Sequence, residues 1–258
     1  MDSRPSPASP FDAWLAALEE RHLADFRPAE VGRALRALSS CYVERRSRLA
    51  EGGALETAGK RAAFALFYAP LHFLTADRVV SALPAPTPVT EVLDLGCGTG
   101  AAGAAWALQC AAGRISGFDR HPWAVAEANW TYRVLGLQGR AYRQDLSRVR
   151  LEPGPGLGIL AAYTINELPD DLRSAWLTRL LDAHARGATV LIIEPIARRM
   201  APWWRGWEER FVAVGGRTDE WRFDAPLPRR QRELARSAGL NPRELRARSL
   251  FADRIATE

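Results

Sequence analysis

The residues best suited to chemistry are the glycines and carboxylates around position 97. Residues 90–101 read T-E-V-L-D-L-G-C-G-T-G-A, so an apolar run ends in glycines at 96, 98 and 100 and leads directly into the Ala-rich segment 101–112. This pattern predicts a strand, a tight turn and a helix. Glycines permit positive φ and let a ligand approach the backbone, and a helix N-terminus offers unpaired N–H groups and a positive dipole end. We therefore expect a nucleotide-like ligand here.

A second carboxylate follows the next predicted strand, 114–118, which ends in Asp119. An acidic side chain at this position can accept hydrogen bonds from both hydroxyls of a ribose. Gly96, Gly98 and Ala101 also fit the G-x-G-x-x-G/A fingerprint of dinucleotide-binding folds. The residues alone therefore leave open an adenosyl cofactor and a nicotinamide dinucleotide.

The run V-L-D-L-G-C-G-T-G at 92–100 resembles the first motif of the class I S-adenosylmethionine-dependent methyltransferases. That resemblance implies S-adenosyl-L-methionine as the cofactor and an adenine site at the end of the third strand, where Asp145 would receive the amino group and Leu146 the ring. Asp145 could instead cap a turn. The expected cofactor-binding residues are Asp94, Gly96, Cys97, Gly98, Thr99, Gly100, Asp119, Arg120, Asp145 and Leu146.

A second polar pair follows the apolar strand that begins at Leu157, where the chain reads I-N-E-L-P at 165–169. Ligands of open α/β sheets bind at the carboxyl ends of the strands, so Asn166 and Glu167 are expected to face the transferred methyl group. Many methyltransferases acting on nitrogen carry D/N-P-P-Y/F here, whereas this chain has Glu-Leu in place of the first proline. For an amine or hydroxyl acceptor, Glu167 would take the proton and Asn166 would orient the acceptor. Alternatively, Asn166 and Asp170 only turn the chain and cap helix 171–185.

A narrower resemblance covers roughly residues 60–200. The stretch A-A-Y-T-I-N-E-L-P, the following Trp176 and V-L-I-I-E-P-I-A-R-R at 190–199 resemble the methyltransferase-like family associated with the small ribosomal subunit. This implies ribosomal RNA or a ribosome-associated substrate. Mitochondrial members carry a cysteine cluster for an iron–sulfur centre, but this chain has only Cys41, Cys97 and Cys110, without C-x-x-C spacing. The four histidines are scattered singly, so we predict no metal site.

The net charge of +5 is concentrated late in the chain. Residues 1–197 carry 21 basic and 21 acidic side chains, whereas residues 198–258 carry 14 and 9. A basic edge can meet phosphates, with Arg198, Arg199 and Arg205 as candidates, although a solvated Arg-rich helix face is the alternative. The methyl acceptor is unidentified, and RNA is narrowly favoured over a small molecule.

The remaining pattern is that of an ordinary globular chain of 258 residues, 47% of them hydrophobic. No run approaches the roughly 20 apolar residues of a membrane span, and the first ten residues lack a signal-peptide apolar region, so we expect a cytoplasmic protein without a membrane partner. The composition does not address the oligomeric state.

The elements that must position these residues divide the chain at about position 88. Helical periodicity over 11–26, 30–51 and 59–83 predicts an N-terminal helical region, 1–88, ended by P-A-P-T-P. Strands and helices then alternate, with further strands at 139–145, 189–193 and 244–251 and a last helix at 227–238. This predicts an α/β fold: a doubly wound, mostly parallel Rossmann-like sheet in a methyltransferase domain, 89–258.

Four functions remain open at this point. The first is an S-adenosylmethionine-dependent methyltransferase acting on ribosomal RNA or a ribosome-associated substrate, and the second is a small-molecule N- or O-methyltransferase. The third is a non-catalytic, cofactor-binding ribosome assembly factor. A nicotinamide-dependent oxidoreductase is the fourth, supported only by the shared glycine spacing.

Overall fold

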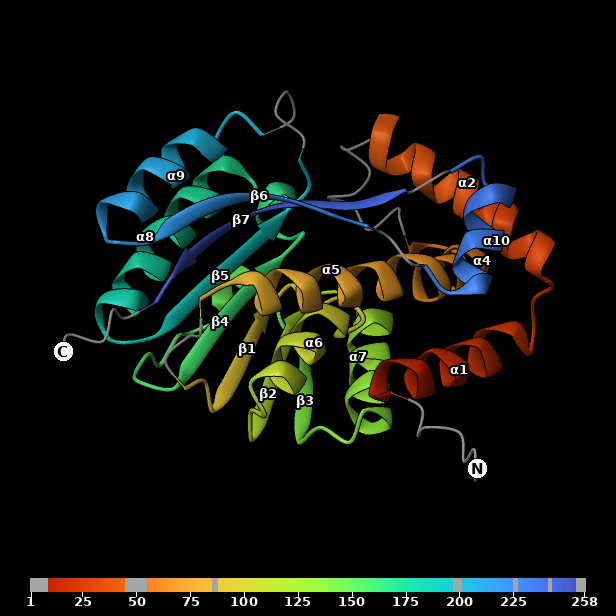
Figure 1. The fold of residues 1–258 in the computed structure, drawn as a ribbon, viewed down its shortest axis with the longest axis horizontal. Coiled ribbons are helices and arrows are strands. Elements are labelled where there is room, and N and C mark those ends of the chain that lie inside the picture. The colour runs from red at the N-terminus through yellow and green to blue at the C-terminus, as the bar shows by residue number, and fades with distance from the viewer. Residues whose placement is uncertain are drawn as a thin grey trace, which may run out of the picture.

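A seven-stranded sheet organises the computed structural model, which describes residues 9–44, 55–84, 88–196, 201–224, 227–240 and 243–253. The strand order is β3-β2-β1-β4-β5-β7-β6 (Figure 1). The strands are β1 (Glu91–Leu95), β2 (Arg114–Asp119), β3 (Gly139–Arg143), β4 (Leu157–Ala162), β5 (Thr189–Glu194), β6 (Arg217–Asp224) and β7 (Glu244–Ala252). Strands β1 to β5 pair in parallel, and β7 runs antiparallel to both β5 and β6. The predicted mostly parallel α/β sheet is confirmed.

Helices cover both faces of this sheet. They are α1 (Pro10–Leu23), α2 (Pro28–Glu44), α4 (Ala58–Ala63), η2 (Phe64–Tyr68), α5 (Ala69–Ala82), α6 (Ala101–Gln109), α7 (Pro122–Val134), η3 (Leu146–Arg148), η4 (Ile165–Glu167), α8 (Asp170–Ala185), α9 (Trp204–Ala213) and α10 (Arg229–Ser237). Successive strand residues point to opposite faces, so Val92 and Leu160 belong to the core under α5, α6 and α7, while Leu93 and Ile159 belong to the core under α8 and α9. The near-continuous apolar strands follow from burial on both faces.

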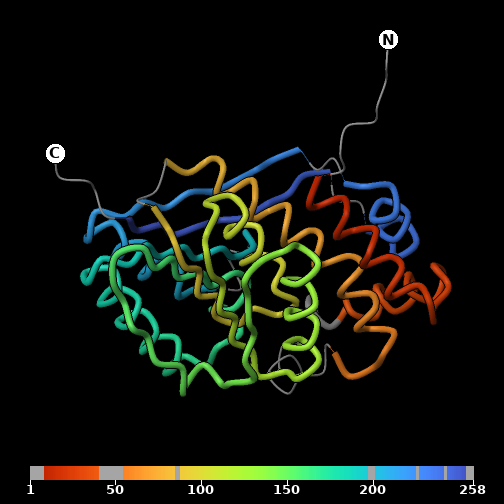
Figure 2. Tube along the Cα trace, turned by 90° about the horizontal axis from the view of Figure 1, so that it is seen from below, coloured from red at the N-terminus to blue at the C-terminus, as the bar shows by residue number. Residues whose placement is uncertain are grey.

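The N-terminal helices pack at the right-hand end of the sheet in Figure 1, together with α10 from the other end of the chain. Figure 2 shows the blue α10 beside the red N-terminal helices. Pro70 leaves the carbonyl of Leu66, one turn earlier, without a helical partner, because proline has no N–H. The buried side chain of Gln231 in α10 donates its Nε2–H to that carbonyl over 3.1 Å. The division into 1–88 and 89–258 stays a prediction, and one apolar core includes residues from both sides of it.

Most predicted elements lie close to their predicted bounds. The helix expected over 59–83 is the continuous run α4, η2 and α5, and the helix expected over 30–51 extends to Glu44, beyond which residues 45–54 lie outside the described part. Residues 1–8 and 85–87, which include most of the P-A-P-T-P stretch, are also outside it. Strand β6 was not predicted, because R-T-D-E-W-R-F-D holds two large apolar residues and lies at the sheet edge, where alternate side chains are exposed.

Candidate functional site

The three glycines after β1 adopt the turn that their spacing predicts. Gly96, Gly98 and Gly100 have φ of 68°, 53° and 76°, a region that residues with a Cβ rarely occupy. A Cβ on Gly96 would lie 2.4 Å from Thr164 and one on Gly100 would lie 2.7 Å from Tyr132, whereas one on Gly98 would meet no atom within 4 Å. The backbone at Gly98 is therefore the open part of the turn, directly before the N-terminus of α6.

Asp119, at the end of β2, connects its carboxylate to this turn. One oxygen accepts the Gly98 N–H over 3.0 Å and the other accepts the His121 N–H over 2.8 Å. Each carboxylate oxygen can accept further hydrogen bonds, and the side chain is half-buried rather than enclosed. An open glycine beside a carboxylate with remaining acceptor capacity fits the ribose of an adenosyl group.

Asp94 lies beneath the turn rather than on its open side. Its side chain is 2% exposed and contacts Gly103 in the first turn of α6, and burial raises the pKa of its carboxyl to about 7. Cys97 and Thr99 are also buried, and burial raises the pKa of the Cys97 thiol. These three side chains shape the turn from within, so any contribution of Cys97 and Thr99 to ligand binding would come from their backbone.

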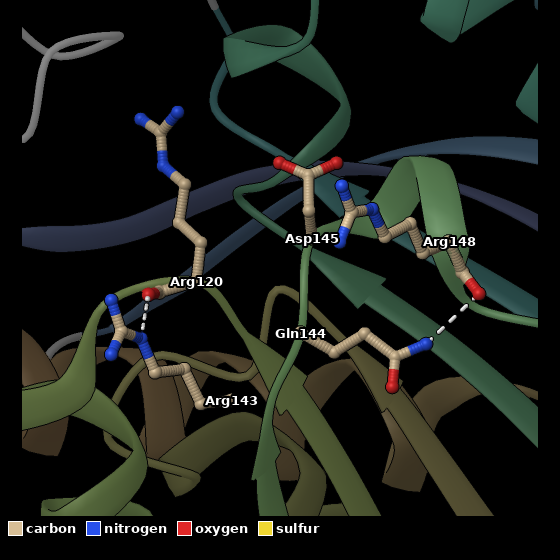
Figure 3. Close-up of a pocket in the computed structure, with 5 residues that line it drawn as sticks. All are labelled: Arg120, Arg143, Gln144, Asp145 and Arg148. Carbon is tan, nitrogen blue, oxygen red and sulfur yellow. Dashed lines mark hydrogen bonds between the residues drawn. The ribbon is translucent and has the colours of Figure 1, made fainter.

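A pocket of about 500 Å³ opens beside the turn, at the carboxyl ends of β2 and β3. Its lining residues are Arg120, Arg143, Gln144, Asp145 and Arg148 (Figure 3). Asp145 caps η3, because one carboxylate oxygen accepts both the N–H and the hydroxyl of Ser147, at 2.8 and 2.6 Å. Its other oxygen is available at the pocket, where Figure 3 places the carboxylate between Arg120 and Arg148. The Leu146 side chain packs into the core instead.

Asn166 and Glu167 lie in η4, the single turn that follows β4. The Asn166 N–H donates to the Glu194 carboxylate over 3.0 Å, and its side-chain oxygen accepts the Trp203 Nε1–H over 3.3 Å. Asn166 is half-buried and Glu167 is exposed. The two predicted residues thus flank the carboxyl end of β4, which pairs with the glycine-bearing strand β1.

Three residues of this edge were not among the predicted site residues. Tyr163 has a φ of 59°, and its ring stacks on His72 of α5 with centroids 4.1 Å apart and planes 18° apart. Glu194, the last residue of β5, is 1% exposed, and burial raises its pKa to about 8. His72 was recognisable as part of the aromatic run 64–73, but no sequence signal indicates the unusual backbone of Tyr163.

Two other features of the described residues bear on function. They contain no group of three or more His, Cys, Asp or Glu side chains arranged to hold a metal ion, and Cys97 and Cys110 are free thiols. Within the same ranges, every helix is too short or too polar to cross a membrane.

Comparisons with known proteins agree with this geometry. The family model of the methyltransferase domain matches residues 92–187, from β1 to the end of α8. The structure of the mitomycin 7-O-methyltransferase MmcR is similar with a TM-score of 0.52 and 15% identity, over 97% of this chain and 74% of that one. No curated protein matches the sequence.

Two further solved structures are more distant. The plantazolicin methyltransferase BpumL in complex with SAH has a TM-score of 0.44 and 14% identity, over 92% of this chain and 100% of that one. The 23S rRNA methyltransferase ErmE has a TM-score of 0.44 and 15% identity, over 70% and 68%.

The family match selects between the two cofactor classes that the glycine spacing left open. It includes the glycine turn, Asp119, Asp145 and η4, which are the predicted cofactor and acceptor positions. The chain therefore carries a methyltransferase domain of the class I type, dependent on S-adenosylmethionine.

Proposed function

We propose that this methyltransferase presents its acceptor at the carboxyl end of β4, with Asn166 orienting the acceptor and Glu167 taking its proton. The observation that carries the proposal is the contact between the two loops. The Thr164 hydroxyl lies 3.3 Å from the Gly96 carbonyl, so the segment that contains Asn166 lies against the glycine turn. A nucleophile held there would be next to the methyl group of a cofactor bound over Gly98.

The residues of this chain would then act mainly by holding the two reactants. The Gly98 backbone and Asp119 would hold the adenosyl ribose, and Asp145 the adenine. S-adenosylmethionine supplies a methyl group on a positively charged sulfur, which an amine or hydroxyl can attack in line. Proximity and alignment contribute most to such a transfer. Glu167 is exposed and can release the accepted proton to water.

For the acceptor we propose RNA, with a ribosomal RNA or a ribosome-associated substrate as the specific case. The support is the resemblance carried by residues 161–199 and the excess of basic residues after 197. Arg198 and Arg199 lie outside the described residues. Arg205 is 88% exposed and lies 3.2 Å from Glu209, so it would exchange this partner for a phosphate.

A small-molecule N- or O-methyltransferase is the second candidate, and it is favoured by further ion pairs in the same segment. Arginines of β6, α10 and β7 lie within 2.8 Å of neighbouring carboxylates, so these side chains already have partners other than a phosphate. The pairs are Arg217–Asp219, Arg229–Glu233 and Arg246–Glu244. In this case the Arg-rich segment is a solvated surface.

The two candidates separate when the protein is incubated with radiolabelled S-adenosylmethionine and total RNA, ribosomal subunits or a metabolite extract, and the label is then fractionated. We expect label in RNA, and we expect Asn166→Ala and Glu167→Gln to reduce it while the exposed control Glu152→Gln does not. Label only in small metabolites would support the second candidate. Cofactor binding with no label in any fraction would instead support a non-catalytic assembly factor.

The salt dependence of RNA binding tests the proposed basic surface. Binding through phosphates should weaken steeply with salt, each contact adding nearly one unit to the log–log slope. Replacing Arg198, Arg199 and Arg205 by alanine should flatten the slope and leave cofactor affinity intact. A salt-independent interaction would contradict RNA as the acceptor.

A further inference from the structure

The segment 163–167, which bears both proposed acceptor-side residues, is held from three directions. Strand β5 contacts it through Ile193 and Glu194, the glycine turn contacts it through Gly96, and α5 contacts it through His72. A connection that only turned the chain toward α8 would not need these contacts.

Tyr163 is the first of the three attachments. A positive φ is unfavourable at a residue with a Cβ, so the surrounding contacts must maintain it. The Tyr163 N–H donates to the Ile193 carbonyl over 2.7 Å, and its ring is stacked on His72. Burial raises the pKa of the Tyr163 hydroxyl to about 12 and lowers that of His72 to about 4, so both rings are neutral near pH 7. The unusual backbone is thus fixed by β5 and α5.

Thr164 is the second attachment, and it follows from the first. The backbone turn at Tyr163 brings the Thr164 side chain against Gly96, where an added Cβ would lie 2.4 Å from Thr164 Cγ2. The two loops are therefore in van der Waals contact, and a displacement of the segment would displace the glycine turn.

Glu194 is the third attachment, and it acts directly on Asn166. Its carboxylate is buried at the end of β5, with one oxygen 3.0 Å from the Asn166 N–H and the other without a hydrogen-bond partner among the described residues. Charged groups face it from two elements, since Glu167 of η4 raises its pKa and Arg248 of β7 lowers it. A buried carboxyl with an unused oxygen destabilises a fold compared with a well-packed apolar residue. Stability alone therefore does not account for a glutamate here.

We propose that Glu194 is a positioning residue of the methyl-transfer site, which keeps Asn166 and Glu167 in place beside the glycine turn by accepting the Asn166 N–H. This inference rests on the proposed roles of Asn166 and Glu167. Glu194 acts through η4 and does not itself contact either reactant.

Hydrogen exchange of the full chain, measured by mass spectrometry on peptides that cover 163–168, tests this role. Glu194→Met keeps the volume but cannot accept the N–H, and we expect exchange in this segment to become at least about tenfold faster, because the Asn166 N–H is left without an acceptor. Glu194→Gln should stay within about threefold of the wild type, because its amide oxygen can accept the same N–H. Affinity for S-adenosylmethionine, measured by calorimetry, should be unchanged in Glu194→Gln.

A matched control is Glu127→Gln, since Glu127 is also 1% exposed and binds His22 and Arg21 where α7 meets α1. It should alter exchange near α1 and α7 but not in 163–168. If Glu194→Met does not fold, Glu194→Asp withdraws the acceptor by one methylene group and should give a smaller acceleration in the same peptides. Unchanged exchange in 163–168, an equal acceleration throughout the sheet, or no rescue by glutamine would overturn the proposal.

The proposed function can fail separately. If Glu194→Met loosens the segment but Asn166→Ala still transfers label normally, Glu194 positions η4 and the role of Asn166 is wrong. If Asn166→Ala abolishes transfer while Glu194→Met leaves exchange unchanged, the proposed role of Asn166 stands and Glu194 does not position it.

Discussion

The Asp119 carboxylate has one observed task and one predicted task. It accepts N–H groups from Gly98 and His121, and we predict that its remaining lone pairs accept ribose hydroxyls. The residue therefore shapes the turn before any ligand binds and would contact the ligand afterwards.

Asp119→Ala should accordingly weaken binding of S-adenosylmethionine by at least about tenfold, because loss of a charged acceptor costs roughly 1.5–3 kcal/mol. Calorimetry measures the affinity, and Asp171→Ala, at an exposed carboxylate in the first turn of α8, is the control. Unchanged affinity in a folded Asp119→Ala protein would remove Asp119 from the cofactor site.

Gly98 can be compared with Gly136, which has a similar backbone but lies outside the proposed cofactor site. Gly98 and Gly136 both have positive φ, and an added Cβ would meet no atom within 4 Å at either position. Valine should lower the free energy of unfolding by about 1–2 kcal/mol at each, since the backbone strain is the same. Only Gly98→Val should also weaken binding of S-adenosylmethionine, and the loss of affinity should be larger than that caused by Asp119→Ala. Retained binding would contradict the proposed approach of the cofactor over Gly98.

Helix α6 packs against β1 where Gly103 contacts Asp94, and this contact should reverse the usual effect of replacing a helical glycine by alanine. Alanine in place of glycine normally stabilises a helix by about 0.5–1 kcal/mol. At Gly103, however, the added Cβ would lie 2.4 Å from the buried Asp94 Oδ2 and 3.0 Å from its Cβ. The helix can approach the strand this closely only because position 103 has no side chain.

We therefore expect Gly103→Ala to destabilise the protein, by about 1–3 kcal/mol for an overpacked site. Gly206→Ala in α9, where an added Cβ would meet nothing within 4 Å, should stabilise it by about 0.5–1 kcal/mol. Urea denaturation of both variants measures whether the free energy of unfolding falls for Gly103→Ala and rises for Gly206→Ala. A stabilising Gly103→Ala would mean that α6 lies farther from Asp94.

Elements differ in how far their sequences determine them. The glycine turn was predictable because positive φ at three alternate positions strongly favours glycine, and β1 and β5 because burial on both faces requires apolar runs. Strand β6 was not, because its pairing with β7 depends on a partner about 27 residues later in the chain, and its own residues alternate at an exposed edge. The same holds for Glu194, whose role comes from a tertiary contact with η4. Asp145 matched its turn-capping alternative, and its cofactor role stays a prediction.

At the scale of the whole molecule, the apolar core connects the N-terminal helices to the sheet. Trp14 and Leu35 belong to the same buried cluster as Val92 and Phe251. We therefore expect stability to be shared between the two predicted regions rather than divided at position 88.

The stability of the whole molecule should also report the buried carboxyl of Glu194. A pKa raised from 4.5 to about 8 in the folded state means that the folded protein retains a proton which the unfolded chain releases. This contribution is fully present below about pH 4.5 and is lost as the pH rises toward 8. Glu194→Gln lacks it, so from pH 5 to pH 8.5 the variant should gain at least about 1 kcal/mol of unfolding free energy relative to the wild type. Parallel curves from urea denaturation at the two pH values would show that Glu194 does not titrate in this way.

The position of β7 between β5 and β6 has a consequence for biosynthesis. Strand β6 is translated before β7 but pairs only with it within the described sheet, and α10, which lies between them in the chain, docks on α2 from the opposite end. While the chain is still being synthesised, the edge of β5 is therefore uncovered, and neither β6 nor the N-terminal helices have all their partners. We infer that the sheet stays unfinished until β7 has been synthesised, and that the insertion of β7, which covers β5 and brings Arg248 opposite Glu194, is a late folding step.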